Sequence, residues 1–288
     1  MNNRNRAYIA FISPSIFIII ILSVIPVILL VTFSTTSWEL IRQGSFKFIG
    51  LENFRHIFRD SRAINSIKVS FYYIIVNTII QMFFGFVLAY LFYRVKKGTQ
   101  LFRSVLLIPS LVPPVVVGIS WRILFTPDLG GINYFLSLLS LKAPDWLSFP
   151  TTALIAVTVA SVWEWTPLVM LVLLAGLESL PTDPIEAAIV DGANELQLIW
   201  MLIIPLMKPI ILVVIILRII DALGILPVIY MMTSGGPGRA TESINVYAYD
   251  VGFKFLNIGY ASSLLVLFVF IIFIFSFLFI LLTMKGKQ

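Results

Sequence analysis

Two apolar stretches of the sequence carry ionisable side chains near their middle. Glu164 lies between Trp163 and Trp165, and Asp221 follows Arg218 by three positions. Placing such a group at the centre of a bilayer costs at least about 2.5 kcal/mol, so each one needs a partner or a purpose. Aromatic faces beside a carboxylate suit a sugar, whose C–H faces stack on the rings while its hydroxyl groups donate to the oxygens. The alternative for Glu164 is a carboxyl group that is bound to a neighbouring helix or protonated.

Other polar residues in these stretches have simpler interpretations. Arg218 and Asp221 share one helix face and could neutralise one another, so both a structural ion pair and a binding role stay open for Asp221. Asn77 and Gln81 are four positions apart and also share a face. We expect this second pair to form hydrogen bonds between helices.

A third group of acidic residues lies in a loop, residues 177–205, between two apolar segments. The loop contains Pro181-Thr182-Asp183-Pro184, where Thr182 or Asp183 is suited to cap a helix that has Pro in its first turn. Apolar residues at helical spacing follow, and Gly192 interrupts them, which allows a sharp bend. The pattern predicts a short helix, a bend and a second helix.

The sequence excludes several kinds of chemistry. It contains no Cys, hence no thiol nucleophile and no Cys-based metal site. It lacks the G-x-x-x-x-G-K-[S/T] phosphate loop, so ATP does not bind by that route. The single His56 has no neighbours at metal-ligand spacing, and no nucleophile elbow is present. We therefore expect a non-catalytic chain that binds no cofactor or metal itself.

The elements that position these residues are membrane-spanning helices. Of the 288 residues, 59% are hydrophobic and 12% charged, and the mean hydropathy is +1.01, values typical of a polytopic membrane protein. Continuous apolar runs of about 20 residues favour helices over barrel strands. We expect one all-α transmembrane domain, residues 1–288, with six spans at about 8–33, 69–93, 103–125, 153–176, 207–232 and 261–283.

Six spans place both termini on one side of the membrane. Lys and Arg are almost evenly divided between the two sides, but four of them, Arg94, Lys96, Lys97 and Arg103, fall in or beside one very short loop. The positive-inside rule weighs short loops most heavily, so we expect both termini, and the 177–205 loop, to be cytoplasmic.

The 177–205 loop resembles a known signature. Glu186-Ala187-Ala188, three residues, Gly192, nine residues and then Leu202-Ile203-Ile204-Pro205 is similar to the "EAA" motif of the permease subunits of ABC importers, which ends Ile-x-Leu-Pro. In that family the loop is a coupling helix that docks on a cytoplasmic ATPase subunit. The resemblance implies a coupling role for Glu186, Ala187, Ala188, Asp191, Gly192 and Pro205.

Further stretches are similar to the carbohydrate-importer permeases of the maltose-permease type. They include "FIGLENFRHIF" at 48–58, "PPVVVGISWRILF" at 113–125 and "RIIDALGILPVIYMMTSGGP" at 218–237. The resemblance implies the type I ABC importer permease fold and sugar contacts from the fourth and fifth spans. By position it points to Ser161, Glu164, Trp165, Leu168, Asp221, Ala222 and Ile225. Several of these differ in type from the family's pattern.

The family also implies partners and a location. They are a second, homologous permease, two ATPase subunits that hold ATP and Mg, and an extracytoplasmic solute-binding protein, all at a bacterial inner membrane. The expected function is import of a carbohydrate, a di- or oligosaccharide, by alternating access. Alternatives are import of a glycerol phosphate ester, ion-coupled secondary transport through Glu164 and Asp221, and a non-transporting scaffold.

Overall fold

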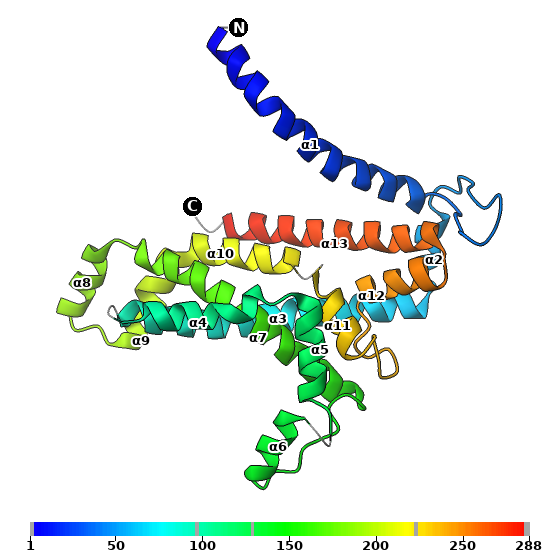
Figure 1. Cartoon of the computed structure of the whole chain (residues 1–288). Helices are drawn as coiled ribbons and strands as arrows, with labels where there is room; N and C mark the ends of the chain where they lie inside the picture. Colours follow the sequence, from blue (N-terminus) through cyan, green and yellow to red (C-terminus); the bar gives the residue numbers. More distant parts are fainter. Residues whose placement is uncertain (1–2, 96–97, 128–129, 222–223, 285–288) are drawn as a thin grey trace. The chain divides into compact units, whose positions relative to one another are not determined.

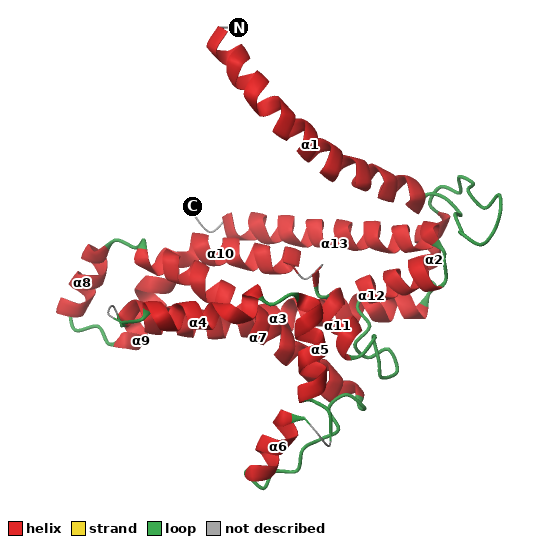
Figure 2. Cartoon of the chain, in the orientation of Figure 1, coloured by secondary structure: helices red, strands yellow, loops and turns green. Residues whose placement is uncertain are grey.

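The computed structural model describes residues 3–95, 98–127, 130–221 and 224–284, and these are helical almost throughout (Figures 1 and 2). No β-strand occurs in the described ranges; two isolated bridges pair Thr36 with Phe48 and Glu39 with Asn257. The all-α fold predicted from the apolar runs is confirmed.

Five helices of the described chain are long and apolar enough to cross a membrane. They cover Ile12–Ser34 of α1 (Asn3–Ser34), α3 (Ser61–Arg94), α7 (Pro150–Glu178), Glu195–Asp221, and Ile258–Phe277 of α13 (Ile258–Met284). A sixth candidate is the pair α4 (Gln100–Leu111) and α5 (Pro114–Leu124), which are bent by 94° at their junction. Val112 is extended there because a residue before proline disfavours the helical conformation.

The fifth span differs from the expected range 207–232. The helix runs from Glu195 to Asp221, through α9 (Glu195–Gln197), the π-helical segment η1 (Leu198–Ile203) and α10 (Ile204–Asp221). Residues 226–232 form a separate helix, α11 (Leu226–Met232), with Pro227 in its first turn. The stretch is apolar on both sides of the break, so hydropathy alone does not locate the end of the helix.

The chain divides into two compact units, which are described separately. The first unit comprises Met1–Ile64 and Tyr247–Ile271, and the second comprises Asn65–Val246 and Ile272–Gln288. The expectation of a single permease domain stays a prediction.

The first unit contains a buried polar network at the start of α3. Asp60 accepts hydrogen bonds from the Tyr260 hydroxyl at 2.7 Å, the Tyr247 hydroxyl at 2.5 Å and the Arg62 backbone N–H at 2.8 Å. Burial raises the pKa of Asp60, but these hydrogen bonds outweigh it and hold the pKa below the ordinary value of 3.8. Arg62 in turn forms a 3.0 Å ion pair with Asp250, in the segment η3 (Asp250–Lys254) that follows α12 (Ile244–Tyr249).

The second unit is built around α7. This helix buries small and apolar residues along most of its length, with α4 and α10 packed against it and α5 packed against α11 (Figure 1). Gly85 of α3 allows an especially close approach, since a Cβ there would lie 2.6 Å from Cγ1 of Val169 on α7. The remaining short helices are α6 (Gly131–Leu138) and α8 (Thr182–Val190) in this unit, and α2 (Glu52–Ile57) in the first unit.

Candidate functional site

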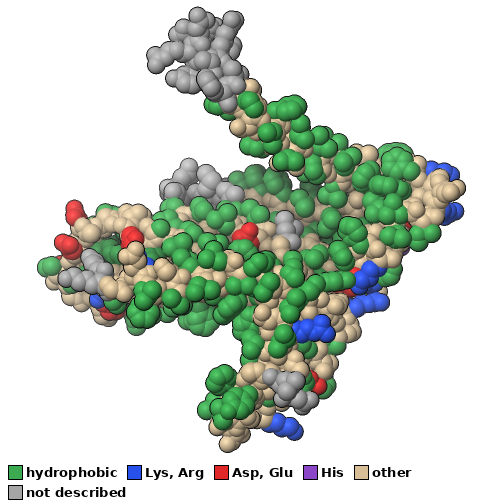
Figure 3. Space-filling view, viewed as in Figure 1, with side chains coloured by type: hydrophobic (Ala, Val, Ile, Leu, Met, Phe, Trp, Pro, Cys, Tyr) green, Lys and Arg blue, Asp and Glu red, His purple; other side chains and the backbone are tan. Residues whose placement is uncertain are grey.

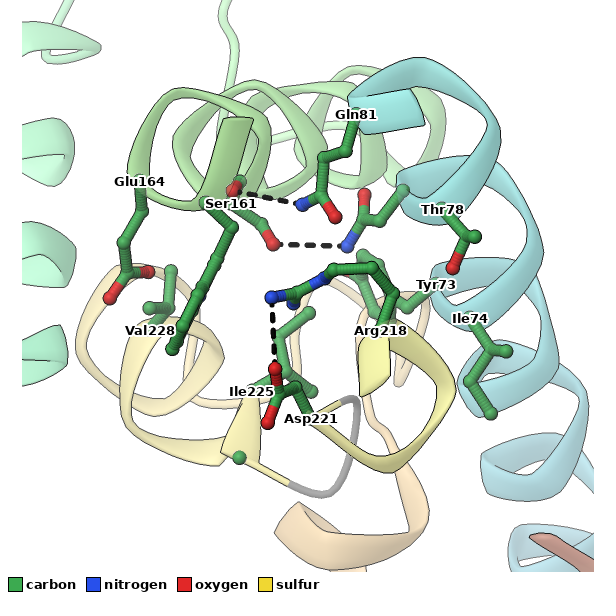
Figure 4. Close-up of a pocket in the computed structure, with 13 residues that line it drawn as sticks. Tyr73, Ile74, Thr78, Gln81, Ser161, Glu164, Arg218, Asp221, Ile225 and Val228 are labelled. Atoms are coloured by element: carbon green, nitrogen blue, oxygen red, sulfur yellow. Dashed lines mark hydrogen bonds and ion pairs between the residues drawn. The ribbon is translucent and has the colours of Figure 1, made fainter. Parts of the chain in front are cut away.

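A small polar cavity lies within the second unit, between α3, α7, α10 and the residues that lead into α11. Figure 4 shows its lining, with Arg218 at the centre and Ser161, Gln81 and Asp221 around it. The cavity has a volume of ≈ 20 Å³. This is enough for a water molecule and too small for a sugar ring, so this conformation is closed around the cavity.

Arg218 is held from two directions. Its Nη1 lies 3.0 Å from Oδ2 of Asp221, and its guanidinium carbon lies 4.5 Å from the centre of the Trp165 ring. The side chain of Arg218 is 7% exposed, whereas that of Asp221 is 39% exposed. The ion pair expected from the three-residue spacing is therefore present, and the stacked indole further stabilises the buried cation.

Two amides on α3 anchor this helix to α7. Asn77 Nδ2 donates to Oγ of Ser161 at 3.1 Å, and Gln81 Nε2 donates to the carbonyl of Ser161 at 3.1 Å (Figure 4). The predicted hydrogen bonding between helices is confirmed. Both amides also line the cavity. The four-residue spacing predicted that they share a helix face, but not that this face borders a cavity.

Several buried oxygen atoms of the cavity find no hydrogen-bond partner among the described residues. They are Oε2 of Glu164, Oδ1 of Asn77, Oε1 of Gln81 and the hydroxyl of Tyr73. Glu164 is only 2% exposed. Buried polar atoms are normally paired, so a cluster of unpaired oxygens indicates a place for a ligand or water that donates hydrogen bonds.

Most of the predicted binding residues meet at this cavity. Its lining includes Ser161, Glu164, Trp165, Asp221 and Ile225. Leu168 does not line it and is 37% exposed, because its position on α7 points elsewhere. Ala222 lies outside the described residues.

The sequence reasoning did not assign Tyr73, Thr78 or Arg218 to the cavity. A usable signal was present, since Tyr73, Asn77 and Gln81 recur every four residues and so share one face of α3.

The 177–205 loop has the predicted helix–bend–helix form. Helix α8 ends at Val190, Gly192 has a φ of +84°, and Asn194 caps α9 through a capping box with Gln197. A left-handed φ favours glycine, which accounts for Gly192 at the bend. The predicted cap at Thr182 or Asp183 is wrong: Pro181 occupies the capping position without a side-chain hydrogen bond, and Pro184 is the third residue of the helix.

The coupling residues named from the motif lie on the surface of this loop. Glu186, Ala187, Asp191, Gly192 and Pro205 are exposed and Ala188 is half-buried. Figure 3 shows acidic and hydrophobic side chains gathered near α8. Large apolar side chains are exposed beside them: Val190 86%, Met201 76%, Leu196 68% and Trp200 68%.

Ion pairs tie this loop to the neighbouring helices. The carboxylate of Glu195 accepts hydrogen bonds from the Tyr90 hydroxyl and from Nη2 of Arg94, both on α3. Arg103 of α4 lies 3.1 Å from Glu178, at the end of α7.

Among the described residues no three His, Asp or Glu side chains are grouped as metal ligands.

Comparison with known proteins decides the family. Residues 81–284 match the model of the family described as "Binding-protein-dependent transport system inner membrane component". The chain belongs to this family. It is a permease subunit of a binding-protein-dependent ABC importer and a multi-pass protein of the bacterial inner membrane.

Two curated relatives of this permease have named substrates. It is 34% identical to the trehalose/maltose transport system permease protein MalF of Thermococcus litoralis, over 83% of the chain and 81% of that protein. It is 30% identical to the sn-glycerol-3-phosphate transport system permease protein UgpA of Agrobacterium fabrum, over 76% of the chain and 75% of that protein.

A solved structure shows the fold. The permease matches a chain of a bacterial ABC transporter involved in the import of the acidic polysaccharide alginate, with a TM-score of 0.82 and 19% identity over 99% of this chain and 97% of that one. At this identity the match concerns the fold alone, and it confirms the importer permease fold predicted from the sequence.

Proposed function

We propose that this permease imports a neutral sugar, a di- or oligosaccharide, through the cavity between α3, α7 and α10. The relationship to a trehalose/maltose permease supports this substrate class. The observation that carries the proposal is the cluster of unpaired, buried oxygens of Glu164, Asn77 and Gln81. Each of these atoms accepts a hydrogen bond, and sugar hydroxyl groups supply the matching donors.

The same cavity favours a sugar over a glycerol phosphate ester. A phosphate group carries up to two negative charges at pH 7 and mainly accepts hydrogen bonds. It would therefore not donate to the unpaired oxygen of Glu164, and its charge would repel a carboxylate there. Arg218 is the one cation among the described residues of the lining, and it already neutralises Asp221. Import of sn-glycerol 3-phosphate, the substrate named for the relative UgpA, remains the second candidate.

The closed cavity fits transport by alternating access. A volume of ≈ 20 Å³ leaves no room for the substrate, so α3, α7 and α10 must separate before it enters. We propose that a solute-binding protein delivers the sugar and that two ATPase subunits supply the energy, acting on this chain and a second, homologous permease. The exposed apolar and acidic surface of the 177–205 loop is the proposed contact with one ATPase subunit, because such surfaces mark protein interfaces.

Uptake by the purified complex tests this function. The permease is isolated with the subunits that co-purify and reconstituted in vesicles with its binding protein, and uptake of labelled maltose, trehalose and sn-glycerol 3-phosphate is measured. ATP-dependent uptake of one of the sugars is expected. Preference for the phosphate ester would move the assignment to the second candidate, and uptake driven by a proton gradient without ATP would indicate a secondary transporter.

A further inference from the structure

One exposed side chain of the 177–205 loop joins two of the helices that line the cavity. Glu195 begins the continuous helical segment Glu195–Asp221, whose other end carries Arg218 and Asp221. Its carboxylate accepts hydrogen bonds from Tyr90 and Arg94, near the end of α3. One end of each helix therefore meets at a single carboxylate.

The opposite parts of these helices form two walls of the cavity. Asn77 of α3 lies 17 residues before Arg94, which is about 26 Å along a helix at 1.5 Å per residue. Arg218 lies 23 residues after Glu195, or about 35 Å along its helix. A helix transmits an axial movement or a tilt over such lengths, so a displacement at Glu195 reaches both walls.

Local packing makes α3 suited to carry this movement. Tyr90 stacks on Phe86 one turn earlier, with ring centres 6.2 Å apart and planes within 14°. Five residues before Tyr90, Gly85 brings α3 into close contact with Val169 of α7. The Glu195 contact therefore acts on a helix that carries an aromatic stack near its end and packs closely against α7 little more than one turn further in.

The ion pair itself adds little to folding. The side chains of Arg94 and Glu195 are 48% and 55% exposed, and pairs this exposed contribute little net stability. A loop that only needed attachment would gain more from apolar contacts, such as that of the buried Ile185. The arrangement suits a mechanical connection that can be removed without unfolding the protein.

We propose that Tyr90 and Arg94 clamp Glu195 so that α3 moves together with the Glu195–Asp221 helix when the 177–205 loop is displaced. The three residues are positioning residues: they touch neither the substrate nor ATP, and act on the cavity through α3. The inference rests on the proposed function, because it requires an ATPase subunit that displaces the loop.

The test measures opening of the cavity on its α3 side. The chain has no Cys, so a Thr78→Cys variant places a single reactive thiol on this subunit in the cavity lining. Labelling of this subunit by a water-soluble maleimide is followed in the complete complex, with and without ATP and vanadate. We expect nucleotide to change the labelling rate by about tenfold, within the usual range of coupling between sites.

Substitutions at Arg94 and Glu195 then distinguish a role in moving α3 from a role in binding the ATPase subunits. In the same background, Glu195→Gln is expected to reduce the nucleotide effect to less than twofold, while the ATPase subunits still co-purify and hydrolyse ATP. We expect each single change, Arg94→Glu or Glu195→Arg, to abolish the nucleotide effect on the labelling rate. The two changes together reverse the ion pair and should restore more than half of this effect. Glu178→Gln is the matched control, because Glu178 is a similarly exposed carboxylate, 51%, whose partner Arg103 lies on α4, a helix that contributes no described residue to the cavity lining; the full effect should remain.

Three results would overturn the inference. They are an unchanged nucleotide effect in Glu195→Gln, a reversed pair that fails to restore what the single changes lose, and loss of the ATPase subunits from the Glu195→Gln complex, which would assign Glu195 to the docking surface. A parent complex without ATPase subunits, or without any nucleotide effect, would overturn the proposed function and this inference with it.

Discussion

The cavity and the 177–205 loop use polar residues in opposite ways. In the cavity, Arg218 is paired with Asp221 and stacked on Trp165, and Asn77 and Gln81 are bonded to Ser161. These groups lie in the apolar interior, where an unpaired polar group costs free energy, so partners within the chain hold them in place. In the loop, Glu186 and Asp191 are exposed and available to another molecule.

The contrast predicts which property each region controls. Substitutions at the paired groups of the cavity should lower the stability of the permease, because they remove partners from buried atoms. Substitutions at the surface of the loop should leave stability almost unchanged and reduce transport, because the proposed partner of this surface is a separate subunit. Stability and transport measured on the same variants therefore distinguish polar groups that are paired within the chain from surface groups that contact a partner subunit.

Gly192→Asp should give the largest effect, and mainly on transport. Apart from the glycine and its two chain neighbours, no described atom lies within 4 Å of a Cβ built at Gly192, so the new side chain has room, although the φ of +84° adds some backbone strain. It would place a negative charge at the bend of the proposed ATPase contact. We expect sugar uptake to fall about 100-fold or more, since an unpaired charge at an interface costs several kcal/mol. Vesicle uptake and the thermal midpoint of the purified complex measure the two properties.

Gly44→Asp provides the control for backbone strain. Gly44 has a φ of +74°, close to the +84° of Gly192, and it too has open space around its Cβ. The same substitution therefore introduces similar strain at a surface outside the 177–205 loop. Equal losses of uptake in both variants would show that strain, rather than contact with a partner, explains the effect at Gly192.

Arg218→Met should lower stability most among the cavity variants. It leaves Asp221 without its cation and removes the group stacked on Trp165. We expect the free energy of unfolding to fall by about 2 kcal/mol, less than for a fully buried pair, because Asp221 is 39% exposed. Denaturation of the purified complex in detergent measures the change.

Asp221→Asn tests the asymmetry of this pair. The amide oxygen still accepts a hydrogen bond from Arg218, and the position is partly exposed, so its effect on stability should be smaller than that of Arg218→Met. A larger effect from Asp221→Asn would show that the carboxylate, and not the buried guanidinium, holds this side of the cavity together.

The membrane-spanning helices, and the ionisable residues within them, could be predicted because the lipid bilayer imposes strong physical constraints. Only long apolar helices satisfy their backbone groups in a bilayer, which located α3 and α7 to within a few residues at most ends. The cost of burying Glu164 and Asp221 marked both as unusual, and both line the cavity. The bend at Gly192 followed from the conformational freedom of glycine.

Other features depend on contacts that composition does not encode. The fifth span was placed at 207–232 because the sequence stays apolar beyond Asp221, whereas packing of α11 against α5 makes 226–232 a separate helix. Leu168 was assigned to the pocket by position in a family, but the rotation of α7 directs it away from the cavity. The meeting of Glu195 with Tyr90 and Arg94 joins residues about 100 positions apart, for which one sequence contains no local signal.

Tyr247→Phe extends the comparison to the first unit, where Asp60 also has its hydrogen-bond partners within the chain. The hydrogen bonds from Tyr247 and Tyr260 hold the pKa of Asp60 below 3.8, so they stabilise the folded state at pH values above the pKa of the unfolded chain. This contribution is lost as the pH falls through the folded pKa. We expect the variant to be less stable than the parent by about 1 kcal/mol at pH 7, the net value of one hydrogen bond, with the difference narrowing below about pH 4.

Unfolding of the purified complex at a series of pH values measures this difference, with Tyr134→Phe as the control because Tyr134 is 63% exposed. The control should match the parent at every pH. A difference between Tyr247→Phe and the parent that stays constant from pH 7 to pH 3 would show that the hydroxyl contributes through packing or another partner. The contribution of the Tyr247 hydroxyl would then be independent of the charge of Asp60. Hydrogen bonds that keep the Asp60 carboxylate ionised would not explain the stability of the first unit.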